Sequence, residues 1–372
     1  MKIIIGGDMV PTESNFDEFC EGRIEKLIDS GIKKALSQAD YRIFNLECPL
    51  YDGNTPIPKT GPNLAAPVST INGILKFKPS LLGFSNNHIL DHGDEGLFST
   101  MTALRDNNTE FIGAGENLQE ATRPYVFELN GIRVGIYACA ENEFSIAGKN
   151  KPGANPFDPL ESLDHISSLK KTCDYVVVLY HGGREHYRYP SPYLQKICRK
   201  IAEKGADLVL CQHSHCIGCY EGYKGSTILF GQGNFLFDRS ESEFWQTSLL
   251  VLADFDVKMT VKYLPICKDG SSVRMSNDEE VEKILSEFET RSKRILEEGF
   301  LEKNYVEFAD GLLNSYLYRF LKPDYPFEEF SESILDDTYY LSALNEIRCE
   351  AHKEVIMTAI KQRLERRFKG EH

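Results

Sequence analysis

The chain has 372 residues, 41% of them hydrophobic and 26% charged, a length and composition that allow a large core and exclude a disordered or fibrous protein. Its 42 basic and 56 acidic residues give a net charge of −14, which argues against nucleic acid as a partner because phosphate backbones require a basic face. The apolar run at residues 3–5 is too short for a signal peptide, and no run is long enough for a membrane span. With ten scattered cysteines, we expect a reduced, cytoplasmic protein.

Short apolar runs alternate with amphipathic segments over most of the chain and predict a layered α/β domain. The runs are rich in Val, Ile, Leu and Phe, which is typical of strands buried on both faces of a helix-covered sheet. They lie at residues 2–5, 41–46, 81–85, 110–112, 133–139, 175–179, 207–211 and 227–230. Helices are predicted at residues 16–35 and 193–204. An antiparallel hairpin is predicted from residues 248–255 and 259–264, around a turn at 256–258.

A polar break at residues 268–278 separates this region from a helical one. Residues 279–298, 301–321 and 339–369 are rich in Glu, Lys, Arg and Leu and are predicted to be helices. We therefore expect a main domain over residues 1–270 and a helical C-terminal appendage over residues 271–372. The appendage contains no motif with recognisable chemistry, and forming a homo-oligomer is one role that it could have.

Polar side chains follow directly after five of the predicted strands. The loops at the carboxyl ends of strands in layered α/β folds converge on one crevice, where ligands bind. The residues at these positions are Asp8, Glu47, Asn87, His88, His181, His213 and His215. Carboxylate, amide and imidazole ligands together suit Mn²⁺, Zn²⁺ or Fe²⁺. Each residue alone would more readily be a turn, a cap or a solvated side chain, but the joint pattern predicts one or two divalent metal ions.

Four further residues are candidates for substrate binding. Arg184 could hold a phosphate or carboxylate through two hydrogen bonds or form a surface salt bridge, and Glu185 beside it could contact substrate or orient a histidine. Lys59 lies in a loop rich in proline and glycine, where it could attract an anionic substrate, belong to a mobile lid or, as the default expectation, be solvated. Asn234 could reach the site or stabilise a turn.

The same polar blocks, in the same order, resemble the bacterial capsule-synthesis CapA family (PGA_cap, poly-γ-glutamate synthesis), a branch of the calcineurin-like metallophosphoesterases. The resemblance runs from residue 1 to about residue 265. Its blocks are Gly7-Asp8, Asn45-Leu46-Glu47, Ser85-Asn86-Asn87-His88 with Asp91 and Gly93, His181-Gly-Gly-Arg-Glu185, His213-Ser-His215, and Gly233-Asn-Phe-Leu-Phe-Asp238. The resemblance implies an α/β/β/α sandwich with a helical C-terminal appendage.

The resemblance also implies two metal positions that share one carboxylate. The first would be bound by Asp8, Glu47 and His215. The second would be bound by Glu47, Asn87, His181 and His213. His88 would be the general acid toward the leaving group, with Asp91 orienting its ring.

The function that the resemblance implies is a metal-dependent hydrolase of the phosphoesterase type in capsule, exopolysaccharide or poly-γ-glutamate biosynthesis. Its substrate would be an anionic small molecule or polymer. The first strand departs from the wider superfamily, which has Asp-x-His where this chain has Asp8-Met9-Val10. Two alternatives stay open: a non-catalytic capsule-assembly protein that keeps the fold as a binding module, and a γ-glutamyl amide hydrolase that uses the same metal site.

Overall fold

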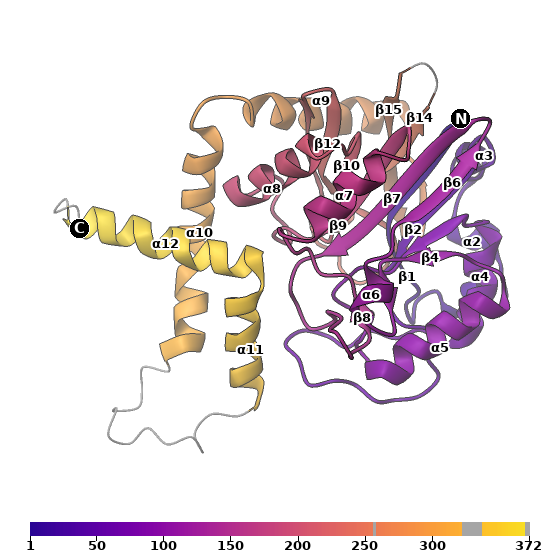
Figure 1. The fold of residues 1–372 in the computed structure, drawn as a ribbon, viewed down its shortest axis with the longest axis horizontal. Coiled ribbons are helices and arrows are strands. Elements are labelled where there is room, and N and C mark those ends of the chain that lie inside the picture. The colour runs from indigo at the N-terminus through magenta and orange to yellow at the C-terminus, as the bar shows by residue number, and fades with distance from the viewer. Residues whose placement is uncertain (256–257, 322–336, 369–372) are drawn as a thin grey trace.

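The structure is a computed structural model that describes residues 1–255, 258–321 and 337–368 (Figure 1). Two β-sheets pack face to face, and helices cover the outer face of each. This is the α/β/β/α sandwich that the sequence predicts, so the fold class is confirmed, and the helical C-terminal region is present as well.

The first sheet is mixed, and its parallel strands lead to the candidate site. In spatial order it contains β16 (Ser272–Met275), β15 (Thr260–Asp269), β14 (Thr247–Asp254), β1 (Lys2–Val10), β2 (Tyr41–Leu46), β3 (Leu81–Gly83) and β4 (Phe111–Ile112). Strands β1 to β4 are parallel neighbours. Strand β14 is antiparallel to β1, β15 to β14, and β16 to β15. A further strand, β13 (Asn234–Phe237), pairs in parallel with the last residues of β1.

The second sheet has a parallel centre with antiparallel edges. In spatial order it contains β11 (Ile217–Tyr223), β12 (Ser226–Gln232), β10 (Leu208–Gln212), β9 (Tyr175–His181), β7 (Ile132–Ala140) and β6 (Tyr125–Leu129). Strands β7, β9, β10 and β12 are parallel neighbours. A separate two-stranded sheet pairs β5 (Ala114–Gly115) with β8 (Gly153–Ala154).

Successive residues of the central strands enter different cores. In β1, Ile3 and Ile5 lie between the two sheets, whereas Ile4 packs beneath the helices of the first sheet, and all three are fully buried. In β9, Val177 lies between the sheets and Val178 packs beneath the helices of the second. Burial of each such side chain contributes about 1.5–3 kcal/mol. Because both faces of these strands are covered, they form continuous apolar runs in the sequence.

The helices and 3₁₀ turns of the sandwich are mostly short. They are α1 (Phe16–Cys20), α2 (Ile24–Leu27), α3 (Ser30–Ser37), η1 (Val68–Thr70), α4 (Ile71–Lys76), α5 (Gly93–Asp106), α6 (Leu118–Ala121), α7 (Ser162–Lys170), α8 (Pro192–Glu203) and η2 (Glu243–Trp245). Helix α8 confirms the prediction at residues 193–204. Its first turn is stabilised by Ser191, whose side chain accepts a hydrogen bond from the Leu194 amide, and by Pro192 at a helix start.

The single helix predicted at residues 16–35 is wrong, because the chain forms three short helices there. Gly22 has φ +67 and ends the first of them. Ile28 is extended at the end of α2, and Asp29 then starts α3 by accepting a hydrogen bond from the Ile32 amide. The apolar periodicity is continuous across these breaks, which is why it could not reveal them.

The C-terminal region is helical, as predicted, but the bounds of its helices differ from the predicted ones. It contains α9 (Asp278–Arg294), α10 (Phe300–Leu321), α11 (Asp337–Arg348) and α12 (Glu350–Phe368). The helix predicted at residues 339–369 is therefore divided at Cys349, and position 369 lies outside the described residues. Strand β16 occupies part of the predicted polar break, and the hairpin of β14 and β15 is confirmed, although residues 256–257 of its turn are outside the described ranges.

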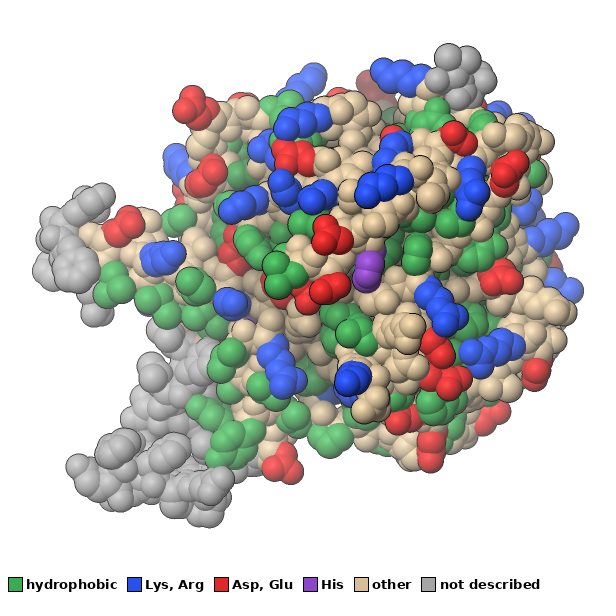
Figure 2. Space-filling view, in the orientation of Figure 1, with side chains coloured by type: hydrophobic (Ala, Val, Ile, Leu, Met, Phe, Trp, Pro, Cys, Tyr) green, Lys and Arg blue, Asp and Glu red, His purple; other side chains and the backbone are tan. Residues whose placement is uncertain are grey.

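Helices α10 and α12 pack on each other beside the sandwich (Figure 1). Helices α11 and α12 also expose large hydrophobic side chains, and Figure 2 shows hydrophobic groups gathered along this part of the molecule. The exposed residues are Tyr340, Leu344, Ile347, Met357, Ile360 and Leu364. An association of copies through this region stays a prediction.

Gly7 in β1 lies close to the backbone of Gly233. An alanine Cβ at this position would lie 2.0 Å from the Gly233 carbonyl oxygen, so backbone would have to move. We expect Gly7→Ala to lower the free energy of unfolding by about 3 kcal/mol in urea denaturation. Gly222→Ala is the matched control in a strand, because an alanine Cβ there would meet nothing within 4 Å. Equal stability of the two variants would contradict the expected steric conflict.

Candidate metal centre

The polar residues predicted at the strand ends are all buried at one end of the sandwich. Asp8 lies near the end of β1, Glu47 follows β2, and Asn87 and His88 follow β3. From the second sheet, His181 ends β9, and His213 and His215 follow β10. Parallel strands of both sheets therefore deliver these side chains to one place, as the sequence predicts.

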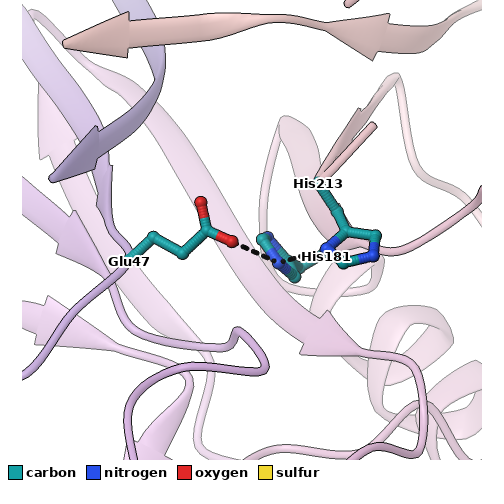
Figure 3. A group of neighbouring side chains, drawn as sticks. All are labelled: Glu47, His181 and His213. Carbon is teal, nitrogen blue, oxygen red and sulfur yellow. Dashed lines mark hydrogen bonds and ion pairs between the residues drawn. The ribbon is translucent and has the colours of Figure 1, made fainter. Parts of the chain in front are cut away.

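Six of these side chains form two groups that share Glu47. Asp8, Glu47 and His215 bring ligand atoms within 4.8 Å of one another, and so do Glu47, His181 and His213. Figure 3 shows the second group, in which the Glu47 carboxylate faces the ring of His181, with the His213 ring beside it. Asn87 joins this group through its Oδ1, which lies 3.0 Å from His181 Nε2. These buried groups are consistent with a metal site that includes Glu47.

Glu47 has an environment that suits a metal ligand. Its side chain is fully buried, yet neither carboxylate oxygen accepts a hydrogen bond from the described residues. Burial is the largest cause that raises the pKa of Glu47, to about 7. An ionised carboxylate without donors is costly in a protein interior. A divalent cation at this place would remove that cost, so the residues present fit the metal that the family resemblance implies.

Several polar atoms surround the Nε2 atom of His181, more than one hydrogen bond could satisfy. His181 Nε2 lies 3.2 Å from Glu47 Oε1, 3.0 Å from Asn87 Oδ1 and 3.2 Å from His213 Nδ1. A single N–H on His181 Nε2 could donate to only one of these three neighbours, and Glu47 Oε1 accepts no hydrogen bond from the described residues. Burial lowers the pKa of His181 and of His213 to about 3, so both rings are neutral at pH 7 and offer lone pairs to a cation.

The other group is centred on Asp8. Burial, followed by the charge of Glu47, raises the pKa of Asp8 to about 6. His215 Nδ1 lies 3.7 Å from Asp8 Oδ2 and 2.8 Å from Asn234 Oδ1. Asn234 therefore contacts the site through His215, whereas its role in substrate binding stays a prediction. Met9 is buried in the core, so β1 supplies Asp8 alone.

The two histidines after β10 have unusual backbone conformations. His213 has φ 88 and His215 has φ 54, both in the left-handed region that side chains other than glycine rarely adopt. Such strain is maintained only where the surrounding structure requires it, commonly at functional sites. Here it turns both rings toward the ends of β1 and β2, where they meet Asp8 and Glu47.

His88 and Asp91 form the predicted pair. His88 Nδ1 lies 2.6 Å from Asp91 Oδ2, and the same oxygen accepts a hydrogen bond from the Leu64 amide. Lys59 Nζ is hydrogen-bonded to Asp91 Oδ1 and lies 3.2 Å from His88 Nδ1. The default expectation that Lys59 is solvated is wrong, because its side chain is only 2% exposed. It is held by the Asp91 carboxylate, an opposite charge in a buried place.

A cavity of about 140 Å³ opens beside this pair. Lys59, His88, Arg184 and Glu185 all line it. Arg184 Nε is buried and has no hydrogen-bond acceptor among the described residues, which favours a ligand-binding role for Arg184 over the surface salt bridge. The cavity could therefore receive an anionic group next to the candidate proton donor.

The C-terminal helices also line this cavity. Ser342, Asn345 and Glu346 of α11 and His352 of α12 contribute to its wall. Thr60 in the loop beside Lys59 is hydrogen-bonded to Ser342. These contacts join residues almost 300 positions apart, so no local pattern could have revealed them.

Four further polar residues surround the centre, and sequence reasoning assigned no role to them. They are Asn45, Asn86, Glu141 and Glu143. Asn45 Nδ2 donates to Asp8 Oδ1 at 2.7 Å, and Asn86 Nδ2 donates to Asn45 Oδ1 at 3.2 Å. Glu143 accepts a hydrogen bond from Asn87 at 3.2 Å. The signal for the two asparagines was their place at the strand ends, whereas nothing local marked the glutamates.

The metal-free protein is expected to lose stability as the pH rises from about 6.5 to 8. Burial raises the pKa of Glu47 to about 7 and of Glu141 to about 8, from 4.5. The stabilising contribution of each is fully present below pH 4.5 and is lost progressively as the pH rises from there through the folded-state pKa, so part of it is still lost above pH 6.5. The lowered pKa of His181 and His213 has the opposite effect, but only below 6.5. Urea unfolding midpoints in chelator at the two pH values test this, and a midpoint that rises would contradict it.

Comparison with known proteins places these observations in a family. A family model described as "Bacterial capsule synthesis protein PGA_cap" matches residues 2–239. The chain is 30% identical over 213 residues to "Capsule biosynthesis protein CapA" of Bacillus anthracis, covering 55% of this chain and 52% of that protein. It is 31% identical over 163 residues to "PGA biosynthesis protein CapA" of Bacillus subtilis (strain 168), covering 43% of each. The chain thus spans about half the length of these curated relatives.

Similar solved structures include a "Putative 5'-Nucleotidase" from Staphylococcus aureus in complex with α-ketoglutarate. It has 16% identity and a TM-score of 0.46, with 78% of this chain and 58% of that one covered. Another is a phosphatase from Mycoplasma pneumoniae, with 17% identity, a TM-score of 0.45, and coverage of 73% and 94%. Within the described residues, no helix combines the length and the apolar character that crossing a membrane requires.

Proposed function

The chain belongs to the bacterial capsule synthesis protein PGA_cap family, and from this premise we propose that it is a metal-dependent phosphoesterase in capsule or poly-γ-glutamate biosynthesis. The substrate would be an anionic small molecule or polymer. The observation that carries the proposal is the Glu47 carboxylate, fully buried, without hydrogen-bond donors among the described residues, and shared by two groups of ligand atoms.

We assign the two metal positions as the resemblance implies. Asp8, Glu47 and His215 would hold one ion, and Glu47, Asn87, His181 and His213 the other. When bound, Mn²⁺, Zn²⁺ or Fe²⁺ ions supply Lewis-acid stabilisation of phosphoryl oxygens and an activated water. Asn45 holds Asp8 Oδ1 in place through its 2.7 Å hydrogen bond, and so orients one ligand.

The protein's own contribution to bond breaking is a proton donor. With Nδ1 of His88 engaged by Asp91, Nε2 is the nitrogen that can give a proton to the leaving oxygen. Asp91 fixes the ring in this orientation, and Lys59 in turn holds Asp91. A non-catalytic binding module has no use for such a pair, which favours the enzyme over that alternative.

Substrate would be held by the cavity beside His88. Arg184 is the side chain best placed to bind a non-reacting anionic group, since its Nε is buried without an acceptor among the described residues and it lines the cavity. Glu185 lies on the same wall and would limit how much negative charge the cavity accepts. These two residues thus oppose each other in charge at the substrate side of the centre.

The test is hydrolysis of p-nitrophenyl phosphate and bis-p-nitrophenyl phosphate by chelator-treated protein reloaded with Mn²⁺, Zn²⁺ or Fe²⁺. We expect activity that depends on the added ion. A metal-loaded protein that hydrolyses neither ester would refute the phosphoesterase. Shortening of poly-γ-glutamate by that inactive protein would instead establish the amide hydrolase, and its absence would leave the binding module.

A further inference from the structure

A second group of metal-ligand side chains lies outside the centre described above. We propose that Glu143, Cys349 and His352 bind Zn²⁺ or a similar divalent cation, which links α12 to the end of the sandwich that holds the Glu47 centre. Ligand atoms of the three residues lie within 4.8 Å of one another. None of the three belongs to the ligand groups around Glu47, so the site is separate from the one on which the proposed function rests.

The ligand types and their placement suit such an ion. Zn²⁺ in proteins is bound by thiolate, imidazole and carboxylate, typically in tetrahedral geometry. Cys349 directly precedes α12, and His352 follows three positions later in its first turn, a spacing that puts both on one helix face. Burial raises the pKa of the Cys349 thiol well above its usual range, so an ion that binds here would displace the thiol proton. Three protein ligands leave one tetrahedral position for a water or another oxygen.

The surroundings of Cys349 are rich in carboxyl groups. Its Sγ lies 3.6 Å from Glu143 Oε1 and 3.8 Å from Glu141 Oε2, and Glu350 is its neighbour in sequence. The hydrogen-bond partners of these carboxylates are amides, hydroxyls and the thiol, such as Asn142 for Glu350. In the described ranges no lysine or arginine forms an ion pair with them. A cation at this place would neutralise the ionised carboxylates among them.

The histidine has an outer partner of the kind that orients a metal ligand. The Tyr316 hydroxyl lies 2.6 Å from His352 Nδ1, and ligating imidazoles usually have their other nitrogen held in this way. Tyr316 is itself buried in the core between α10 and α12. The ring of His352 is therefore positioned by the packing of the C-terminal helices.

An ion here would connect the C-terminal helices to the catalytic centre. Glu143 accepts the hydrogen bond of Asn87, the amide proposed for the second metal position. Glu143 and His352 both line the cavity beside His88. The bound cation would thus fix one wall of the substrate cavity, and its open position would face substrate or solvent there.

The test replaces metal in the full-length protein with Co²⁺, because a thiolate ligand adds a sulfur-to-cobalt charge-transfer absorption. The centre around Glu47 has only oxygen and nitrogen donors and cannot produce this absorption. We expect the wild type to show it and Cys349→Ala to lose it together with one equivalent of cobalt. Cys173→Ala, which removes another buried cysteine, should keep both.

Two further variants separate the sites. Glu143→Gln keeps an acceptor for Asn87 but removes the ligand charge, and we expect it to weaken cobalt binding at the thiolate site by at least about tenfold. Glu47→Gln should empty the catalytic centre yet retain the sulfur absorption, so each proposal can fail alone. Absence of the absorption from the wild type, or its persistence in Cys349→Ala, would overturn the proposal. If Cys349→Ala does not fold, X-ray absorption spectroscopy of the zinc-loaded wild type is the test. A zinc spectrum without a sulfur neighbour would then overturn the proposal.

Discussion

Glu47→Gln is expected to lower kcat on phosphoesters by about 10³-fold or more and to remove bound metal from the catalytic centre. The reason is that Glu47 belongs to both ligand groups, so one substitution takes the charged ligand from two positions. Glutamine retains the size of the side chain, which keeps the packing at the end of β2. Metal content by mass spectrometry and steady-state kinetics measure the two effects.

Stability distinguishes this loss of function from a loss of fold. Burial raises the pKa of Glu47 to about 7, so the ionised side chain destabilises the metal-free protein at pH 8. Metal-free Glu47→Gln should therefore unfold at a higher urea concentration than metal-free wild type, although it is inactive. Glu221→Gln is the control, because Glu221 is a buried glutamate paired with Arg199 and its loss should weaken the fold while metal stays. Full metal content in Glu47→Gln would contradict the assignment.

His88→Asn is expected to lower kcat by about 10²–10⁴-fold while metal content is unchanged. His88 is absent from both ligand groups, and its Nδ1 is held by Asp91, as a proton donor requires. The loss should depend on the leaving group. It should be larger for phenyl phosphate than for p-nitrophenyl phosphate, because p-nitrophenolate is a weak base and needs little protonation as it leaves.

The leaving-group comparison is what a purely structural role would not produce. A variant that only disturbed the fold would lower both rates by the same factor. His165→Asn is the matched control, since His165 lies in α7 beside Tyr137, outside the ligand groups, and should leave the ratio of the two rates unchanged. Equal losses in His88→Asn for the two esters would show that His88 is not the general acid.

Much of the fold could be predicted from the apolar runs in the sequence. The run at residues 41–46 coincides with β2, and the runs at 175–179 and 207–211 lie within one or two residues of β9 and β10. These strands are recognisable because covered faces require continuous apolar residues. Strands β11 and β16 were among those missed, since both carry polar residues, and β11 also glycines, as is typical of sheet edges. The apolar periodicity of residues 16–35 also did not reveal the breaks between α1, α2 and α3.

The amino-acid sequence by itself determined which polar residues follow the apolar runs, and with them the set of candidate metal ligands. The end of an apolar run can be recognised locally, although β1 continues beyond the predicted run at residues 2–5 to Val10. Parallel pairing then brings the strand ends together. Only the tertiary structure decided that α11 and α12 cover the cavity and that Asn142 meets Glu350, 208 positions away. It also decided that Lys59 is buried against Asp91. Such contacts depend on how the helices and strands pack after they form. The apolar periodicity of a helix does not show which other element it packs against.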